Sequence, residues 1–307
     1  MAELEVRNLT KRYGRKTVAV DDLSFGVEAG RVTGFLGPNG AGKTTTMRAL
    51  LGLLRPSGGE ALVEGKPPTA MERPLETIGA ALEATAFHPG RSGRNHLRGL
   101  AAAAKLPRSR VEEVLEMVEL TGAGHRRVKG YSLGMRQRLA LAAALLGDPR
   151  ILILDEPANG LDPQGMRWLR DLLRAQAAEG RTVFVSSHVL SEVDQTADEL
   201  VVIRGGKLVA QTTLAEFTAS GRVPSRVRAA DPERLAAALT ARGATVERDD
   251  GALLVSGLGG EEIGELALAE GIALHELAPQ RSSLEERFLE VMDDDQDGGA
   301  DDVGEGR

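Results

Sequence analysis

A glycine-rich stretch that ends in a lysine and two threonines, GPNGAGKTT, runs from Gly37 to Thr45. Two glycines at the spacing of the phosphate-loop pattern are followed directly by Lys43 and Thr44. Glycines let backbone N–H groups curl around an anion without interference from a Cβ atom, and the N-terminus of a following helix favours negative charge. Lys43 can then reach the β- and γ-phosphates, and the Thr44 hydroxyl can bind Mg²⁺. The residues predicted to form this nucleotide site are Gly37, Pro38, Asn39, Gly40, Ala41, Gly42, Lys43, Thr44 and Thr45.

A pair of neighbouring carboxylates ends a second apolar run, ILILDEPANGLDP, from Ile151 to Pro163. Such a pair, taken alone, is often a solvated turn. Here both the acid pair and Lys43 follow predicted parallel strands, whose carboxyl ends are where open α/β sheets bind ligands. Adjacent side chains of a strand point to opposite faces, so the two acids can have different roles. We expect Asp155 to hold the Mg²⁺ shell beside Thr44 and Glu156 to polarise the attacking water, because a carboxylate engaged with a metal is a poor base.

The elements that must position these residues indicate an α/β domain in the first part of the chain. Apolar strands that are separated by helices are typical of a parallel sheet covered on both faces. The last two strands form a predicted hairpin about Gly205-Gly206. The predicted strands are Leu4–Leu9, Leu23–Val27, Arg31–Leu36, Ile151–Leu154, Val183–Val185, Glu199–Arg204 and Lys207–Gln211, and the predicted helices are Thr45–Leu54, Val111–Leu120, Arg136–Leu146 and Met166–Ala178.

The pattern changes after about Ser220, where a second, smaller domain is predicted. Strand, helix, strand, strand, helix and strand follow one another, which is the order of the ferredoxin-like α+β unit. A last helix, Leu284 to Met292, precedes a tail with seven acids and one base, which we expect to be disordered. We therefore predict three parts: an α/β domain with the ATP-binding site over 1–220, an accessory α+β domain over 221–292 and an acidic tail over 293–307.

The bulk composition of the 307 residues narrows the classes of function. There is no cysteine, which excludes thiolate catalysis, disulfides and sulfur metal sites and fits a reducing cytoplasm. The longest uncharged run, Val32 to Gly42, has 11 residues, whereas a membrane span needs roughly 20, and no signal peptide pattern opens the chain. Most of the net charge of −7 lies in the tail, so the folded body has no basic excess, and we expect a soluble protein with no nucleic-acid partner.

Six motifs, taken together in their order along the chain, resemble those of the ATP-binding subunit of an ABC transporter. The resemblance covers about Leu4 to Ser220. Besides the two stretches above, YSLGMRQRLALAAAL from Tyr131 resembles the family's signature, and NGLD from Asn159 resembles the loop after the second acid. His188, in VSSHVLSEVD, occupies the place of the family's switch histidine. Tyr13, in KRYG, matches the aromatic residue that stacks on adenine.

The resemblance implies a P-loop NTPase sheet with a helical subdomain over about 84–147, and ATP and Mg²⁺ as ligands. It also implies a head-to-tail dimer, either a homodimer or a pair with a similar ATPase subunit, that sandwiches two ATP molecules. A helix N-terminus that carries Ser132 and Gly134 is a second anion site, and one chain needs only one triphosphate cradle. In such a dimer these two residues would complete the partner's γ-phosphate site, with Asp162 at the interface. His188 would contact the γ-phosphate on its own side, beside Lys43.

Some positions depart from the family's pattern. Leu133 and Met135 replace the usual glycine and glutamine of the signature, and Ala158 stands where threonine is frequent. The loop between the sheet and the helical subdomain has Glu83 where glutamine is usual. A carboxylate there can approach the Mg²⁺ shell, and a branch of the family that resembles bacitracin and lantibiotic exporters has glutamate at this place.

The function implied by the resemblance is that of a cytoplasmic ATPase, held on the inner face of the membrane by a separate permease, which drives export. The C-terminal SSLEERFLEVM resembles the end of subunits that serve drug, antibiotic or polysaccharide exporters. One alternative is a soluble ABC-type ATPase that acts on ribosomes or DNA, although such proteins usually have two ATPase units or long coiled-coil insertions. Another is a nucleotide-gated regulator with weak turnover. The sequence leaves the transported substrate open.

Overall fold

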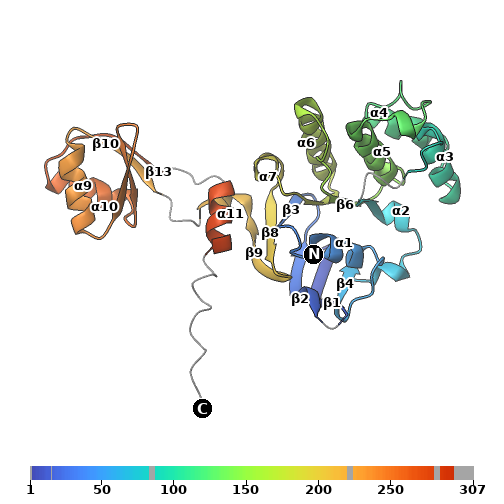
Figure 1. The fold of residues 1–307 in the computed structure, drawn as a ribbon, viewed down its shortest axis with the longest axis horizontal. Helices are drawn as coiled ribbons and strands as arrows, with labels where there is room; N and C mark the ends of the chain where they lie inside the picture. Colours follow the sequence, from blue (N-terminus) through green and yellow to red (C-terminus); the bar gives the residue numbers. More distant parts are fainter. Residues whose placement is uncertain (1, 15, 83–86, 220–223, 280–283, 294–307) are drawn as a thin grey trace, which may run out of the picture. The chain divides into compact units, whose positions relative to one another are not determined.

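Figure 1 shows the computed structural model, which describes residues 2–14, 16–82, 87–219, 224–279 and 284–293. The chain divides into two compact units, Met1–Thr213 and Leu214–Arg307. The division lies before the expected boundary at 220 because the short helix α8 (Leu214–Ala219) packs against α11 (Leu284–Asp293), where Arg287 lies 5.9 Å from the ring centroid of Phe217. The acidic tail from residue 294 onward lies outside the described residues.

The first unit contains two sheets with helices between and beside their strands (Figure 1). The larger sheet has the order β5-β6-β7-β3-β8-β9, in which only β9 is antiparallel to its neighbour. The smaller sheet, β2-β1-β4, is antiparallel throughout. The strands are β1 (Leu4–Tyr13), β2 (Thr17–Val27), β3 (Val32–Leu36), β4 (Gly58–Val63), β5 (Ile78–Ala81), β6 (Ile151–Asp155), β7 (Thr182–Ser186), β8 (Glu199–Arg204) and β9 (Lys207–Thr213). The helices are α1 (Lys43–Leu50), α2 (Pro74–Thr77), α3 (Gly93–Ala103), α4 (Ser109–Met117), α5 (Leu133–Leu145), α6 (Pro163–Ala178) and α7 (Leu190–Thr196).

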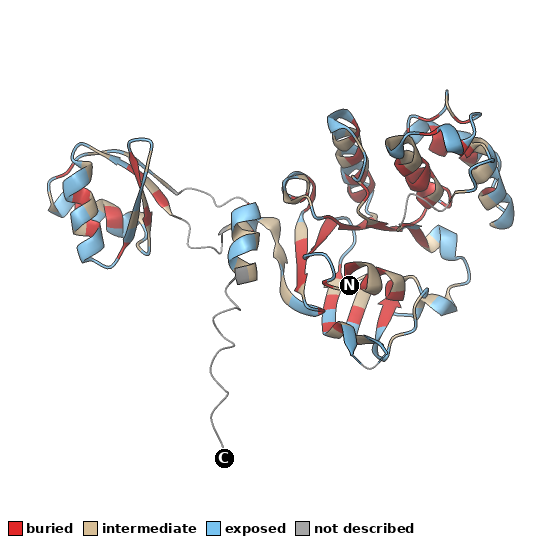
Figure 2. Cartoon of the chain, in the orientation of Figure 1, coloured by how far each residue is buried: buried red, intermediate tan, exposed pale blue. Residues whose placement is uncertain are grey.

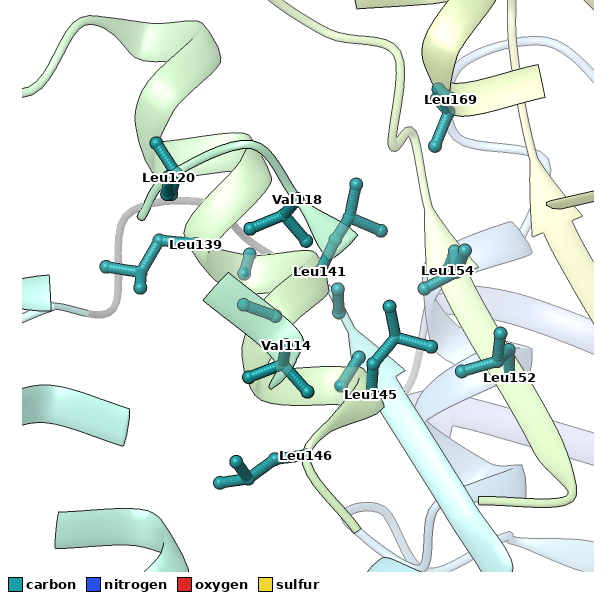
Figure 3. Packing of buried hydrophobic residues seen from close by; sticks show 14 of the residues in the cluster. Val114, Val118, Leu120, Leu139, Leu141, Leu145, Leu146, Leu152, Leu154 and Leu169 are labelled. Carbon is teal, nitrogen blue, oxygen red and sulfur yellow. The ribbon is translucent and has the colours of Figure 1, made fainter. Parts of the chain in front are cut away.

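The side chains of β6 point alternately into two apolar cores, which lie on opposite faces of the larger sheet. Leu152 and Leu154 belong to a core that also contains residues of α4, α5 and α6, as Figure 3 shows. Ile151 and Ile153 belong to the other core, which the sheet shares with α1 and the smaller sheet. Both faces are therefore buried (Figure 2), and the polar residues that follow β6 emerge at the edge where the strand ends.

The helical subdomain is held to the sheet by α5, an Ala/Leu-rich helix that is apolar around most of its circumference. Leu141 and Leu145 of α5 lie in the same core as Leu152 and Leu154 (Figure 3). A helix with so little polar surface must be covered on several sides, and α3, α4 and β5 pack against it. This packing places the N-terminus of α5 near the edge of the sheet where β6 ends.

The strands and helices that the sequence predicts for the first unit are confirmed, with shifted ends. The predicted helix Thr45–Leu54 begins at Lys43 and ends at Leu50, because Gly52 has a φ of 67° and the chain turns there. Five elements were not predicted from the sequence, namely β4, β5, α2, α3 and α7, which are short or polar enough to lack a clear period. No helix within the described ranges is long and apolar enough to cross a membrane.

The second unit has the predicted order of a ferredoxin-like fold. Its elements are β10 (Ser225–Ala229), α9 (Pro232–Ala241), β11 (Thr245–Asp249), β12 (Ala252–Ser256), α10 (Gly260–Ala269) and β13 (Leu274–Pro279). The antiparallel sheet has the order β11-β12-β10-β13. Val227, Val255 and Ile263 lie in a core that this sheet shares with α9 and α10. The α+β interpretation of this part of the chain is thus confirmed.

Candidate functional site

The phosphate loop connects β3 to α1 at the carboxyl edge of the larger sheet. Gly40 and Gly42 have φ values of 83° and 104°, which side chains with a Cβ rarely adopt. A Cβ on Gly42 would also lie 2.4 Å from the backbone oxygen of Ala19, so only glycine fits there. Among the described residues no side chain caps α1, and its first N–H groups remain directed toward the loop. The loop therefore presents backbone donors in the way that an anion requires.

Lys43 lies inside this loop, with only 7% of its surface exposed. Its Nζ donates to the backbone oxygens of Gly37 and Pro38, at 2.5 and 3.3 Å. Burial lowers the pKa of the Lys43 ammonium, and the nearby charges of Glu156 and Asp155 oppose this shift. A cation that is desolvated and bound only to neutral carbonyls is well prepared to exchange them for an anionic phosphate.

Asp155 is the last residue of β6, and the parallel sheet brings it to the start of α1. The Thr44 hydroxyl donates to Asp155 Oδ2 at 2.6 Å, although 111 residues separate the two in sequence. The other carboxylate oxygen, Oδ1, accepts a hydrogen bond from the Ser186 hydroxyl. A hydroxyl and a carboxylate oxygen in contact are the donor types that Mg²⁺ takes from proteins when phosphate oxygens supply further ligands, so this pair fits the expected ion.

Glu156 and His188 form a contact pair beside the acid that ends β6. His188 Nδ1 lies 2.6 Å from Glu156 Oε2, and the His188 backbone N–H donates to the same oxygen at 3.3 Å. An ionised carboxylate only accepts hydrogen bonds, so Nδ1 is the protonated nitrogen in this contact. Glu156 has a φ of 51°, a left-handed conformation that is uncommon outside glycine. His188 is about half exposed and Glu156 about one fifth exposed, so both can reach a ligand.

A cavity of about 660 Å³ brings both acids together with the predicted loop residues Pro38, Asn39, Gly40, Gly42, Lys43, Thr44 and Thr45. Within the described chain Gly37, Ala41 and His188 do not line it. Five further residues line it that were not among the predicted site residues, although Leu133 and Asn159 belong to the motifs named above: Ala19, Leu82, Leu133, Gln137 and Asn159. Gln137 follows Leu133 by four positions in α5, and this spacing, which places two residues on one helix face, could have indicated it. Ala19 comes from β2, and nothing in its sequence surroundings marks it.

Ser132, Gly134 and Asp162 do not line this cavity within the described chain, although Leu133, which lies between the first two, does. The Ser132 hydroxyl accepts from the Met135 N–H at 3.2 Å and thereby caps α5. Asp162 caps α6 in the same way, because its Oδ1 accepts from the Gly165 N–H at 2.8 Å. A Cβ on Gly134 would lie 3.0 Å from the Gly160 oxygen, so the signature stretch packs closely on the loop after the second acid. The three residues are thus local structural residues within one chain.

The remaining two expected residues have different outcomes. Tyr13 ends β1 with 45% of its surface exposed, and Lys11 Nζ lies 5.3 Å from the centroid of its ring. It does not line the cavity in the described chain, but its exposed ring could stack with a planar ligand. Glu83 lies outside the described residues. Its neighbour Leu82 lines the cavity.

Comparison with known proteins matches both units. A family model described as ABC transporter matches residues 20–159, and a model described as a domain of unknown function matches residues 225–285. The chain is 39% identical, over 94% of its own length and 95% of the relative's, to the uncharacterized ABC transporter ATP-binding protein YhcH of Bacillus subtilis. It is 34% identical, over 94% of its length and 97% of the relative's, to the bacitracin transport ATP-binding protein BcrA of Bacillus licheniformis.

Solved structures show the same fold for the first unit. An ATP-binding subunit of an ABC transporter superposes with a TM-score of 0.64 at 27% identity, over 71% of this chain and 92% of that one. The ATP-binding cassette MJ0796, in a dimeric post-hydrolysis state bound to ADP and phosphate, has a TM-score of 0.63 over 69% of this chain and 98% of that one; at 21% identity this likeness concerns the fold. The relatives match nearly the whole chain, and the phosphate loop and the acid pair meet in one cavity. The chain therefore belongs to the ABC transporter family, as an ATP-binding subunit with an ABC ATPase fold.

Proposed function

We propose that this chain is the ATP-hydrolysing subunit that energises export of a substrate, a drug or antibiotic, through a separate membrane permease. The relatives that match it over most of their length include a bacitracin transport protein, and a lantibiotic transport protein of Streptococcus pyogenes is 37% identical over 67% of the chain. The observation that carries the ATPase part is the convergence of Lys43, Thr44, Asp155 and Glu156 on one cavity.

In this proposal each residue has a defined chemical role. Lys43 releases its two carbonyl partners and donates to the β- and γ-phosphates of ATP. Thr44 and Asp155 hold Mg²⁺, with Glu83 as a further proposed ligand, and the ion neutralises charge on the phosphate oxygens when it is bound. Glu156 accepts a proton from the water that attacks the γ-phosphate, and the Nδ1–H of His188 keeps its carboxylate directed toward that water.

The proposed assembly is a head-to-tail pair of ATPase subunits on the permease. Ser132, Gly134 and Asp162 do not line the cavity of their own chain in its described part, which leaves them available to a partner's nucleotide. The N-terminus of α5, which begins after Ser132, would then add backbone donors to the γ-phosphate of the partner's ATP. The subunits of such a pair are two copies of this chain or one copy and a similar subunit.

The transport proposal is tested by affinity purification of the tagged protein from detergent-solubilised native membranes, followed by mass spectrometry. We expect a polytopic membrane protein in stoichiometric amount and an ATPase rate that rises when this partner is present. Recovery of only soluble proteins or ribosomes, with a fully active ATPase, would favour the soluble alternative. Recovery of a permease together with this chain, but with no ATP turnover by the complex, would favour the interpretation as a nucleotide-gated regulator.

Replacement of Tyr13 by alanine should weaken ATP binding, because the exposed ring is the proposed stacking surface for adenine. By analogy with base–aromatic stacks the expected loss is about 1–3 kcal/mol. Tyr13→Phe is the matched control, since it keeps the ring and removes only the hydroxyl. Isothermal titration calorimetry with ATP compares the three proteins, and equal affinity of Tyr13→Ala and the unchanged protein would remove Tyr13 from the site.

A further inference from the structure

Ser186, the last residue of β7, contacts both acids of the candidate site. Its hydroxyl donates to Asp155 Oδ1 and accepts a hydrogen bond from the Glu156 backbone N–H at 3.0 Å. The backbone oxygen of Ser186 accepts from the same N–H at 3.2 Å. The parallel register of β6 and β7 places Asp155 directly opposite Ser186. One side chain therefore bridges the two carboxylate residues through separate hydrogen bonds.

The two hydrogen bonds fix the orientation of the Ser186 hydroxyl. The residue is 0% exposed, so water cannot replace either bond. A serine hydroxyl has a single proton, and here the carboxylate of Asp155 takes it, which leaves the oxygen lone pairs for the Glu156 N–H. Removal of the hydroxyl would thus leave Asp155 with one hydrogen-bond partner fewer and the Glu156 N–H with only the longer backbone bond.

The bond to Glu156 matters because of the conformation of that residue. Its φ of 51° is unusual for a residue with a side chain and persists only where the surroundings hold it. Both bonds that its N–H makes come from Ser186, so Ser186 helps to hold the backbone turn that directs the Glu156 side chain toward His188. On the other side, the bond to Oδ1 leaves Oδ2 of Asp155 directed toward Thr44.

We propose that Ser186 is a positioning residue of the ATPase site, which orients the Asp155 carboxylate for the metal and holds Glu156 in the backbone conformation that directs its carboxylate toward the attacking water. The inference rests on the proposed function. It assigns to a buried serine the task of setting the relative placement of the two acids. Small misplacements of catalytic groups can cost about 100-fold in rate, so the effect should be measurable.

The test compares Ser186→Ala with Ser186→Thr, which keeps a hydroxyl, and with a control on the same strand. Thr182→Val is that control, because Thr182 is also 0% exposed and its hydroxyl also donates to a carboxylate, that of Glu3 at 2.5 Å, at the opposite end of β7. All proteins are measured for kcat, KM for ATP, the Mg²⁺ concentration at half-maximal rate and melting temperature. The ¹⁵N NMR signal of the His188 imidazole, recorded without nucleotide or metal, reports its bond to Glu156.

For Ser186→Ala we expect kcat to fall by roughly 10- to 100-fold, the Mg²⁺ midpoint to rise several-fold and KM for ATP at saturating Mg²⁺ to change less than about threefold. The His188 signal should lose its hydrogen-bonded character. Ser186→Thr should restore kcat, and Thr182→Val should lower the melting temperature without a change in kcat, Mg²⁺ midpoint or His188 signal. Should Ser186→Thr fail to fold, the inference is tested by Ser186→Ala alone, through a kcat that falls while KM stays nearly constant and through the His188 signal.

Two results would overturn the inference. One is a Ser186→Ala protein with the kcat and His188 signal of the unchanged protein. The other is a loss of kcat that Thr182→Val shares, which would show a general loss of strand stability. Either result leaves the proposed function standing as long as Glu156→Gln is inactive. Conversely, an active Glu156→Gln would refute the assignment of the acids, whatever Ser186→Ala shows.

Discussion

Replacement of Glu156 by glutamine is expected to abolish ATP turnover and to leave ATP binding intact. The substitution keeps the size of the side chain and removes the charge that accepts the proton of the attacking water. A positioned general base contributes about 10²- to 10⁴-fold, so the rate should fall by that range. ATP affinity should hold because Lys43, Thr44 and the backbone donors of the phosphate loop are untouched. Phosphate release in steady state and ATP titration by calorimetry measure the two quantities.

The structure offers a control for this experiment. Glu179, which follows the last residue of α6, is exposed and forms an ion pair with the partly buried Arg181. Glu179→Gln therefore removes a charge of the same kind at a place outside the cavity, and this variant should turn over ATP normally. The Glu156 variant should also weaken the contact with His188 Nδ1, since the amide oxygen of glutamine can still accept this hydrogen bond but carries no charge. Normal turnover in Glu156→Gln would show that another residue, or the phosphate itself, takes the proton.

Replacement of Lys43 by methionine is expected to remove both ATP binding and hydrolysis. The ammonium group is buried and bound to two carbonyl oxygens, and the phosphates of ATP would give it an anionic partner. A hydrogen bond to a charged group contributes about 1.5–3 kcal/mol, so loss of the contacts to phosphate should weaken ATP binding at least about tenfold. Lys66→Met, at an exposed lysine, is the control, and calorimetry with ATP is the measurement. Tight ATP binding by Lys43→Met would contradict the assigned role.

The same lysine should make the free energy of unfolding of the protein rise with pH in the alkaline range. Burial lowers the pKa of Lys43 below 10.5, so between that lowered pKa and 10.5 the unfolded chain retains a proton that the folded chain has released. Whenever the unfolded state binds more protons, the free energy of unfolding rises with pH. The contribution of Lys43 to stability should therefore increase across this window and stay constant below it.

Denaturant unfolding of the ATP-free protein and of Lys43→Met, between pH 7 and pH 10.5, measures this contribution as a difference. The difference in free energy of unfolding should shift in favour of the unchanged protein as the pH rises. A constant difference would mean that the ammonium group is as well solvated in the fold as in the unfolded chain. In that case the burial of Lys43 would not be the reason for its readiness to bind phosphate.

Several elements of the site could be predicted because they depend on neighbouring residues. Gly40 and Gly42 allow backbone conformations that other residues avoid, and Lys43 begins the helix that follows them. The apolar run that ends at Asp155 is long enough for a buried strand, whose carboxyl end is a usual place for a ligand. Such preferences act over a few residues, so they can be read without knowledge of the partners in space.

The ends of elements and the short strands were harder to predict for the same reason. β5 has only four residues, Ile78–Ala81, and its strand conformation comes from pairing with β6, which lies 70 residues further along the chain. The boundary between the two units is another case. α8 follows the larger sheet directly in sequence, and its contacts with α11 place it in the second unit. Neither feature has a local signal in the sequence.

The sequence by itself determined which residues bear the chemistry of this protein: the glycine loop with Lys43 and Thr44, the acid pair, and the order of motifs that indicates an ABC ATPase. Only the tertiary structure decided how they meet. It brings Thr44 within 2.6 Å of Asp155, pairs Glu156 with His188 and sets Ser186 between the two acids. The physical reason is that these contacts follow from the register of parallel strands, which is set by the burial of alternating side chains in two cores and by no interaction between neighbours in sequence.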